Sequence, residues 1–363
     1  MTGGRKIAYR TVRGTKKQAE AELSKAVAEM HAGGFIDGTN MTVKEYLGRW
    51  LKDHAAVTVS AKTLERYTEL ADRHLSPRLG AHALQKLTPM HIQNAYSDML
   101  ESGRIKGGGG LSARTVHHVH RLLFQALRQA VRWQLLSRNP AEAVTPPKPP
   151  PTEIAILDED QVGVLLKAAR STRMYTPILL AITTGLRRGE VFGLRWTDID
   201  LENGRLSVAQ ALEQTKAGIA FKAPKTKRSR RTVTLPSVTI EALRAHRAKQ
   251  AAERLALGLG KDDLGLVFTS PLGAPVSVRA VSKEFARIVK RAKLPPLTFH
   301  GLRHSHLTAL LKAGVHPKIA SERAGHASVA ITMDVYSHVL PSMQDGLTGG
   351  VDAAIRKALA EQT

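Results

Sequence analysis

A short run of prolines sets the strongest constraint on how this chain can fold. Residues 146–151 are Pro-Pro-Lys-Pro-Pro-Pro. Proline lacks a backbone N–H and fixes φ near −65°, so no helix or central strand can continue through such a run. A proline-rich segment instead forms a semi-rigid extended spacer. At 363 residues the chain is also long for a single domain. We therefore predict a linker at 146–152 between two main domains, 41–145 and 153–340.

The domain before the linker carries helical patterns. Thr42 and Glu45 have the spacing of a capping box, in which each side chain bonds the other residue's backbone N–H. The apolar positions behind it follow the spacing of one buried helix face. These positions are Val43, Tyr46, Leu47, Trp50 and Leu51.

Further helices are expected at Thr63–Leu75, from Pro89 onward, and, capped by Ser112, over Ala113–Leu136. The last of these carries Arg114, Arg121, Arg128 and Arg132. The pattern predicts a small helical bundle with basic faces.

The domain after the linker combines helical patterns with one interval of alternating residues. Strands are expected at Gly204–Val208, Ile219–Ala223 and Arg231–Leu235. The predicted class is mainly α with a small antiparallel β-sheet, that is, α+β. A helix is expected over residues 16–32 of the N-terminal segment 1–40, and another at Val351–Glu361 within the tail 341–363.

The charge balance indicates a polyanionic partner. Lys and Arg total 54 against 31 Asp and Glu, which gives a formal charge of +23. Such an excess opposes compaction, and nucleic acid is the first partner to consider. An anionic membrane is less favoured, because no apolar run approaches the length of a spanning helix. The chain has no cysteine, and its N-terminus lacks the apolar core of a signal peptide. We expect a protein of the bacterial cytosol or nucleoid.

The first candidate site segment runs from Thr184 to Trp196. Gly185 ends one helix, Arg187 opens the next, and Glu190 lies one turn along on the same side. Taken alone, this pattern fits an ordinary helix start with a surface ion pair equally well.

A second segment contains His300 and Arg303 at the start of a helical run. Their i, i+3 spacing places both on one face, where an imidazole and a guanidinium suit phosphate oxygens. In isolation a solvated helix face is the commoner meaning of such a pair. His304 and His306 are expected to point elsewhere.

A third segment contains Gly325-His326 and, ten positions after His326, Tyr336. Most tyrosines simply pack with their hydroxyl satisfied, so Tyr336 alone would indicate nothing more. The three segments together give the order Arg…His-x-x-Arg…Gly-His…Tyr, which is specific.

This order resembles the catalytic domain of the tyrosine recombinases, the phage integrase family, over about residues 155–340. Residues 41–145 resemble the helical, SAM-like core-binding domain of that family. Residues 1–40 resemble part of an arm-binding domain whose preceding strands are missing, which implies either a late start codon or a vestigial arm. Ala324 stands where the family usually has leucine before Gly-His, which we expect to alter only packing.

A very basic stretch, 222–236, supports the resemblance and is expected to form a hairpin. In the family a lysine on this hairpin enters the active site; Lys225 is the best match, and Lys227 is the alternative. The cations here and on the helical domain are expected to contact DNA phosphates. They are Lys222, Lys227, Arg228, Arg230, Arg231, Arg114 and Arg121.

The resemblance also implies roles. Tyr336 would attack phosphorus and leave a 3′-phosphotyrosyl bond, while Arg187 and Arg303 would bind the non-bridging oxygens. Three other side chains would act at the phosphate: His300 would assist proton movement, His326 would bond a phosphate oxygen, and Lys225 would protonate the leaving oxygen. Glu190 would orient Arg187. The covalent link conserves bond energy, so we expect no ATP, metal or other cofactor.

By resemblance the chain is a site-specific integrase of a phage or mobile element, which integrates or excises DNA through a Holliday junction. Its partners would be double-stranded attachment sites, three further copies in a tetramer, and an accessory DNA-bending or directionality protein. The C-terminal helix would dock on a neighbouring copy. The direction of the reaction and the DNA sequence of the site stay open.

Three alternatives remain at this point. A type IB topoisomerase shares the chemistry, but the helical domain and the C-terminal docking helix argue against it. A DNA-binding protein without catalysis is opposed by the expected residue type at every catalytic position. A metalloprotein would use histidines without acidic partners in a ligand pattern. These histidines are His300, His304, His306, His326 and His338.

Overall fold

The computed structural model divides the chain into two compact units, residues Met1–Thr152 and Glu153–Thr363. The structure describes residues 11–31, 40–104, 107–150, 155–223, 230–260, 264–326, 328–336, 356–357 and 359–360. The side chains of residues 25, 26, 28–31, 331 and 334–336 lie outside this description. No helix among these residues is both long enough and apolar enough to cross a membrane.

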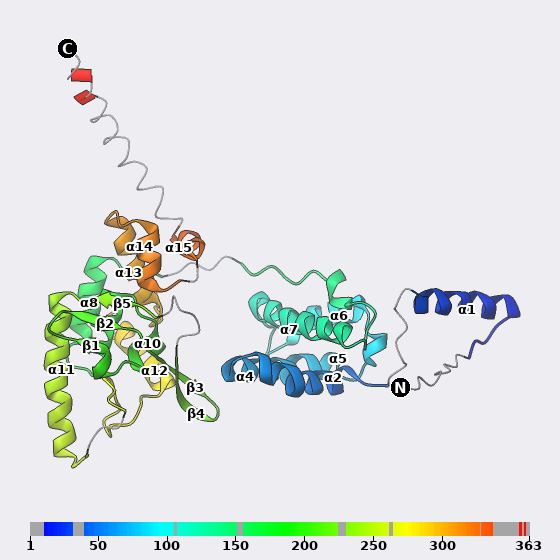
Figure 1. Ribbon diagram of the computed structural model, residues 1–363, viewed down its shortest axis with the longest axis horizontal. Coiled ribbons are helices and arrows are strands. Elements are labelled where there is room, and N and C mark those ends of the chain that lie inside the picture. Colours follow the sequence, from blue (N-terminus) through cyan, green and yellow to red (C-terminus); the bar gives the residue numbers. More distant parts are fainter. Residues whose placement is uncertain are drawn as a thin grey trace, which may run out of the picture. The chain divides into compact units, whose positions relative to one another are not determined.

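The first unit is helical (Figure 1). Single turns of π-helix at Leu51–Ala55 and Ala71–Leu75 extend α2 and α4. The helices are α1 (Lys16–His31), α2 (Val43–Trp50), α3 (Ala56–Thr58), α4 (Ala61–Leu70), α5 (Ser76–Leu79), α6 (Pro89–Ser102) and α7 (Ala113–Arg132).

Local sequence signals set where these helices begin. Thr42 caps α2 in a full capping box with Glu45, as expected. Thr88 caps α6 ahead of Pro89, and Ser112 caps α7, whose last helical residue is Arg132 and not Leu136. Four of the five residues of the expected inward face are at most 2% exposed, namely Val43, Tyr46, Leu47 and Trp50. The fifth, Leu51, is partly buried. The helix α7 packs against α2, α4 and α6, so it forms the centre of this core.

The second unit joins helices to two small antiparallel sheets, which confirms the mainly helical α+β class. One sheet has the order β1-β2-β5, and the other is the hairpin β3-β4. The strands are β1 (Ile199–Asp200), β2 (Arg205–Ser207), β3 (Ala211–Thr215), β4 (Gly218–Lys222) and β5 (Thr232–Thr234). The helices are α8 (Glu159–Ala169), α9 (Tyr175–Thr184), α10 (Arg188–Phe192), α11 (Ser237–Ala256), α12 (Val278–Arg291), α13 (Gly301–Lys312), α14 (Pro317–Ala324) and α15 (Val329–Tyr336).

The pairing of the strands corrects one expectation. Residues 222–236 were predicted to form a hairpin, but β4 pairs with β3 and β5 pairs with β2. The basic stretch therefore connects two different sheets. The strand β3 was missed, because Ala211–Thr215 shows little apolar alternation and only Leu212 is buried.

Three helices bring the candidate segments together. The helix α9 is buried along most of its length and ends at Thr184, with Gly185 as its C-cap shortly before α10 begins at Arg188. The helix α13 packs against both α9 and α14, and α14 packs against α15. Residues near 187, 303 and 326 thus meet in one region, although up to 139 positions separate them in the sequence.

Candidate active site

Arg187 and Glu190 are held together at the start of α10. Arg187 is the N-cap residue, and its backbone N–H donates a hydrogen bond of 2.9 Å to Glu190 Oε2. Its Nη1 donates to Glu190 Oε1, also at 2.9 Å. The expectation that these two side chains share one face is confirmed. Glu190 is only 6% exposed, whereas the Arg187 side chain is 38% exposed, so the pair has a buried carboxylate and a partly exposed guanidinium, unlike the fully exposed pair that the local pattern also allowed.

Glu190 joins Arg187 to a second guanidinium. Arg231 Nη2 donates to Glu190 Oε2 at 2.8 Å, and Arg231 Nη1 donates to Oε1 at 3.2 Å. Burial raises the pKa of Glu190, but the hydrogen bonds and positive charges of Arg231 and Arg187 outweigh it, so its pKa lies below the ordinary value. The carboxylate is therefore ionised and fixed between two cations.

The position of Arg231 differs from the expectation that it contacts DNA. Its side chain is only 7% exposed, and besides Glu190 it donates from Nε to the carbonyl of Arg323 at 2.7 Å. Both Nη groups of Arg231 are bonded to Glu190 and its Nε to Arg323, so this guanidinium is less available to a DNA phosphate than an exposed cation would be. Sequence reasoning missed this role, because Arg231 stands in a run of cations whose members look alike.

Two glycine carbonyls orient the two candidate phosphate-binding arginines. Arg303 Nη1 donates to the carbonyl of Gly185 at 2.8 Å, and Arg187 Nη2 donates to the carbonyl of Gly325 at 2.8 Å. Gly185 and Gly325 each end a helix with φ of +68°, a conformation that other residues adopt only with strain. The chain reversal at each glycine turns its carbonyl toward the arginine.

His300 and His304 lie edge to face beside these arginines. Their ring centroids are 4.9 Å apart at an interplanar angle of 90°. The expectation that His304 points elsewhere is wrong, because one turn of α13 brings its ring back against His300. Partial burial, followed by the positive charges of His304 and Arg303, lowers the pKa of His300 to about 4. The imidazole is therefore neutral at neutral pH and able to exchange a proton.

His326 follows Gly325 and is held by α15. Its Nδ1 lies 2.7 Å from the hydroxyl oxygen of the fully buried Thr332. Burial, with Arg303 and Arg187 close by, lowers the pKa of His326 to about 4. Tyr336 is the last residue of α15, one helical turn beyond Thr332, and its side chain lies outside the described residues.

A contact behind the site between the buried His306 and the partly buried Arg323 was not predicted. Arg323 Nε donates to His306 Nε2 at 3.2 Å, and Arg323 Nη2 donates to the carbonyls of Thr183 and Thr234, both at 3.1 Å. His306 also bonds the backbone of Ile182. Arg323 thus ties α14, α9 and β5 together behind Gly185. No sequence motif signals it, because one arginine on a short helix looks like a surface residue.

The remaining candidates are placed as follows. Lys225, Lys227 and Arg228 lie outside the described residues. Lys222 forms an ion pair with Glu213 across the β3-β4 hairpin, while Arg230 is exposed. Arg114 and Arg121 are exposed on α7 in the first unit. Within the described ranges, no group of three or more His, Cys, Asp or Glu side chains could hold a metal ion.

Comparison with protein families gives two matches. The model of the phage integrase family matches residues 155–343, and the model of the phage integrase N-terminal SAM-like domain matches residues 42–100. A tyrosine recombinase XerC-like protein of Caldanaerobacter subterraneus is 30% identical over 349 residues, which cover 91% of this chain and 88% of that protein. An integrase of Streptomyces ambofaciens is 29% identical over 354 residues, 94% of this chain and 88% of that protein.

Solved structures show the same fold. The Tn1549 transposon integrase in complex with a circular intermediate DNA superposes with a TM-score of 0.69 at 22% identity, covering 82% of this chain and 95% of that one. A lambda integrase tetramer bound to a Holliday junction gives 0.60 at 21% identity, covering 89% and 88%. The phage integrase family model covers the segments that contain Arg187, Arg303 and His326, and the relative at 30% identity covers 91% of the chain. The chain belongs to the phage integrase family, the tyrosine recombinases, which are enzymes of site-specific DNA recombination.

Proposed function

We propose that this chain cleaves and rejoins DNA at a specific site through a covalent bond between Tyr336 and the 3′-phosphate. The observation that carries the proposal is the two hydrogen bonds from arginines to glycine carbonyls, Arg187 to Gly325 and Arg303 to Gly185. These bonds fix two guanidinium groups in one region, together with two neutral histidines. A transferring phosphodiester needs such fixed positive charge around its oxygens.

The two arginines form the clamp for the non-bridging phosphate oxygens. Arginine suits this task, because it stays charged at any working pH and presents several N–H donors in one plane. Arg303 is 1% exposed, and Arg187 is held by Glu190 on one side and Gly325 on the other. Neither side chain needs to reorganise when the negative charge of the transition state develops, which is the source of the rate gain. Glu190 is a positioning residue for Arg187.

Proton transfer falls to the neutral side chains and to a lysine. When the Tyr336 oxygen attacks phosphorus, the P–O5′ bond breaks, the phenol proton leaves, and the 5′-oxygen takes up a proton. His300, neutral at working pH, is suited to assist the proton of Tyr336. His326 donates a hydrogen bond to a phosphate oxygen, and Lys225 protonates the 5′-oxygen. Reversal with a new 5′-hydroxyl rejoins the strand.

The assembly follows from strand exchange between two DNA sites. Four active sites cleave and exchange first one strand and then the other strand of each duplex. This strand exchange passes through a Holliday junction, and it integrates or excises a phage or mobile element. Residues 41–145 bind the DNA core site with Arg114 and Arg121, residues 153–340 carry the chemistry, and 146–152 link them. Lys222, Lys227, Arg228 and Arg230 add phosphate contacts. The N-terminal segment 1–40 binds arm DNA, the tail 341–363 docks on a neighbouring copy, and an accessory protein bends the DNA or sets the direction.

The test is covalent trapping. The full-length protein is incubated in EDTA with a nicked suicide duplex that carries its attachment region, and the products are separated on a denaturing gel. We expect a protein–DNA adduct from the unmodified protein and none from Tyr336→Phe. Tyr175→Phe, at the start of α9, is the matched control and should retain the adduct.

Two results would contradict the proposal. An adduct that persists in Tyr336→Phe would assign the nucleophile to another residue. Binding of the attachment region without any adduct from the unmodified protein would favour a DNA-binding protein that lacks catalysis.

A further inference from the structure

A pocket of about 390 Å³ lies beside His300, between the start of α10, the helix α12 and the loop before α13. Its floor is apolar and consists of the buried side chains of Phe285, Leu297 and Phe299. The polar groups at its edge come from Arg188, Ser282, Thr298 and His300. A concave, mostly apolar site with a few convergent polar groups is the usual form of a ligand site.

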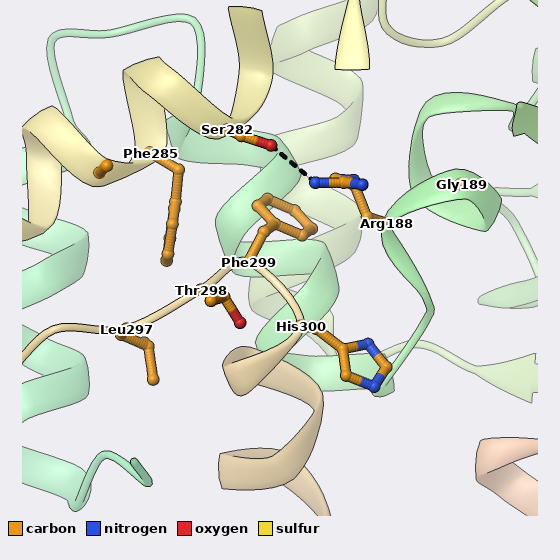
Figure 2. Close-up of a pocket in the computed structure, with 9 residues that line it drawn as sticks. Arg188, Gly189, Ser282, Phe285, Leu297, Thr298, Phe299 and His300 are labelled. Atoms are coloured by element: carbon orange, nitrogen blue, oxygen red, sulfur yellow. Dashed lines mark hydrogen bonds between the residues drawn. The ribbon is translucent and has the colours of Figure 1, made fainter. Parts of the chain in front are cut away.

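Arg188 points away from its neighbour Arg187. Whereas Arg187 bonds to Glu190 and Gly325, Arg188 Nη1 donates to the hydroxyl oxygen of Ser282 on α12 at 2.6 Å. Figure 2 shows this bond, with the ring of Phe299 below it and His300 on the same pocket. Ser282 in turn donates to the carbonyl of Val278 at 2.9 Å, so its hydroxyl is fixed as an acceptor for Arg188.

The half-buried Arg188 has no acidic partner in the described part of the chain. No carboxylate there forms an ion pair with it, whereas Arg187, Arg195 and Arg231 each have one. Burial alone lowers the pKa of Arg188, and no negative charge opposes that effect. A guanidinium has five N–H donors, and the bond to Ser282 accounts for one of them. A partly buried cation without a counter-ion indicates an anionic ligand.

The pocket also offers a hydroxyl and a shared imidazole. Thr298 Oγ1 accepts a hydrogen bond from the backbone N–H of Gly301, which leaves its own hydrogen free to donate, as far as the described residues show. His300 lines this pocket, and the charges of both Arg187 and Arg188 act on it. An anion bound at Arg188 and one bound at Arg187 would therefore both be neighbours of His300.

We propose that this pocket binds the DNA phosphodiester next to the cleaved one, with Arg188 and Thr298 on its oxygens and its deoxyribose against Phe285 and Phe299. The pocket is larger than a phosphate alone requires, and an apolar floor suits the C–H groups of a sugar. The inference rests on the proposed function, because it places the cleaved phosphate at Arg187 and Arg303. The subsite would set the position of the strand by its backbone and not by its bases.

The experiment couples one side chain to one phosphate. Duplexes of the attachment region carry a single methylphosphonate at successive positions around the cleavage point, which removes one charge at a time. Binding to the full-length protein is measured by fluorescence anisotropy for the unmodified protein, Arg188→Gln and Arg188→Lys. Arg287→Gln is the matched control, because Arg287 is exposed on α12 and already paired with Glu284.

We expect one flanking methylphosphonate to weaken binding by the unmodified protein roughly tenfold, as the loss of one charge-assisted bond suggests. Arg188→Gln should weaken binding to unmodified DNA by a similar factor and lose all sensitivity to that methylphosphonate. Arg188→Lys should retain part of the sensitivity, and Arg287→Gln all of it. The plot of log affinity against log salt has a negative slope, and its magnitude should decrease by about 0.9 in Arg188→Gln.

Additive effects of Arg188→Gln and every methylphosphonate would overturn the proposal. A free anion is the other source of the same chemistry, so inorganic phosphate and a deoxynucleoside monophosphate are titrated without DNA. The pocket would be assigned to a free ligand if phosphate or the nucleotide binds in a manner that depends on Arg188, while Arg188→Gln and the methylphosphonates act additively on DNA binding. The binding measurement does not require cleavage, so it can fail or succeed independently of adduct formation. If Arg188→Gln and the methylphosphonates act additively but Tyr336 still forms an adduct, only the subsite is rejected. If they act non-additively but no adduct forms, only the cleavage assignment is rejected.

Discussion

The guanidinium of Arg187 donates a 2.8 Å hydrogen bond to the carbonyl of Gly325, 138 positions later in the chain. Gly325 directly precedes His326, so the bond fixes the distance between the end of α14 and the start of α10. The matching bond from Arg303 to Gly185 fixes α13 against the same region. The candidate active site is therefore a set of helix ends that are held together by side-chain hydrogen bonds. Substitutions that remove these bonds should alter the site even where the substituted residue does not contact DNA.

Replacing the buried carboxylate of Glu190 should destabilise the protein. Glu190→Gln leaves Arg187 and Arg231 close together without a counter-charge, which should lower the free energy of unfolding by about 3–5 kcal/mol. Urea unfolding measures the change, and Glu284→Gln, in an exposed pair, should stay within about 0.5 kcal/mol of the unmodified protein. The double change Glu190→Gln with Arg231→Gln should cost less than the sum of the two single changes. Strict additivity would mean that the two side chains do not act as a pair.

The glycine at the end of α9 should not tolerate a side chain. A Cβ at Gly185 would lie 2.6 Å from Cδ2 of His306, in addition to the strain of about 1–2 kcal/mol from its positive φ. Gly314 has a φ of +77° but open space around its Cβ position, so Gly314→Ala isolates the strain alone. We expect Gly185→Ala to lower the unfolding free energy and adduct formation clearly more than Gly314→Ala does. Equal effects of the two substitutions would show that the contact with His306 is unimportant.

The buried His306 should make stability depend on pH. Burial, followed by the charge of Arg323, lowers its pKa to about 4, while the unfolded chain takes up this proton near pH 6.5. The unfolded state thus binds more protons between these values, and the free energy of unfolding falls as the pH drops from 7 to 4. This residue contributes up to about 3 kcal/mol of that fall.

His306→Gln tests this origin of the pH dependence. Glutamine keeps an acceptor for Arg323 but does not titrate, so unfolding free energies measured from pH 4 to pH 7 should change less steeply. His316→Gln, at the exposed start of α14, is the control. An unchanged slope in His306→Gln would place the pH dependence elsewhere.

Arg323 should act on catalysis through position alone. Arg323→Met removes the bonds to His306, Thr183 and Thr234, and we expect a loss of about 2–4 kcal/mol in unfolding free energy. The rate of adduct formation should fall while DNA affinity stays within about twofold, because the side chain is bonded to other groups of the protein. Arg323→Lys should restore part of the rate, and Arg287→Met should change neither quantity. A large loss of affinity at an unchanged cleavage rate would instead make Arg323 a DNA contact.

The sequence by itself determined the features that local chemistry dictates. The capping box of Thr42 and Glu45, the buried face of α2 and the helix starts at Pro89 and Ser112 need only neighbouring residues, and all are present. The family could also be recognised, because the order of Arg187, His300, Arg303, His326 and Tyr336 is specific even though each residue alone is ambiguous. The mainly helical class followed from the spacing of apolar residues.

Only the tertiary structure decided which cations are bonded to distant parts of the protein. Arg231 and Arg323 look like the many other basic residues of a chain with a charge of +23, yet each is held by partners between 17 and 140 positions away. The same applies to β4 and β5, which pair with β3 and β2 and not with each other. The spacing of apolar residues along one segment indicates which face is buried, but it does not indicate which other element that face packs against. The partner of a buried charge depends on helices that meet in space, and this information is absent from local spacing.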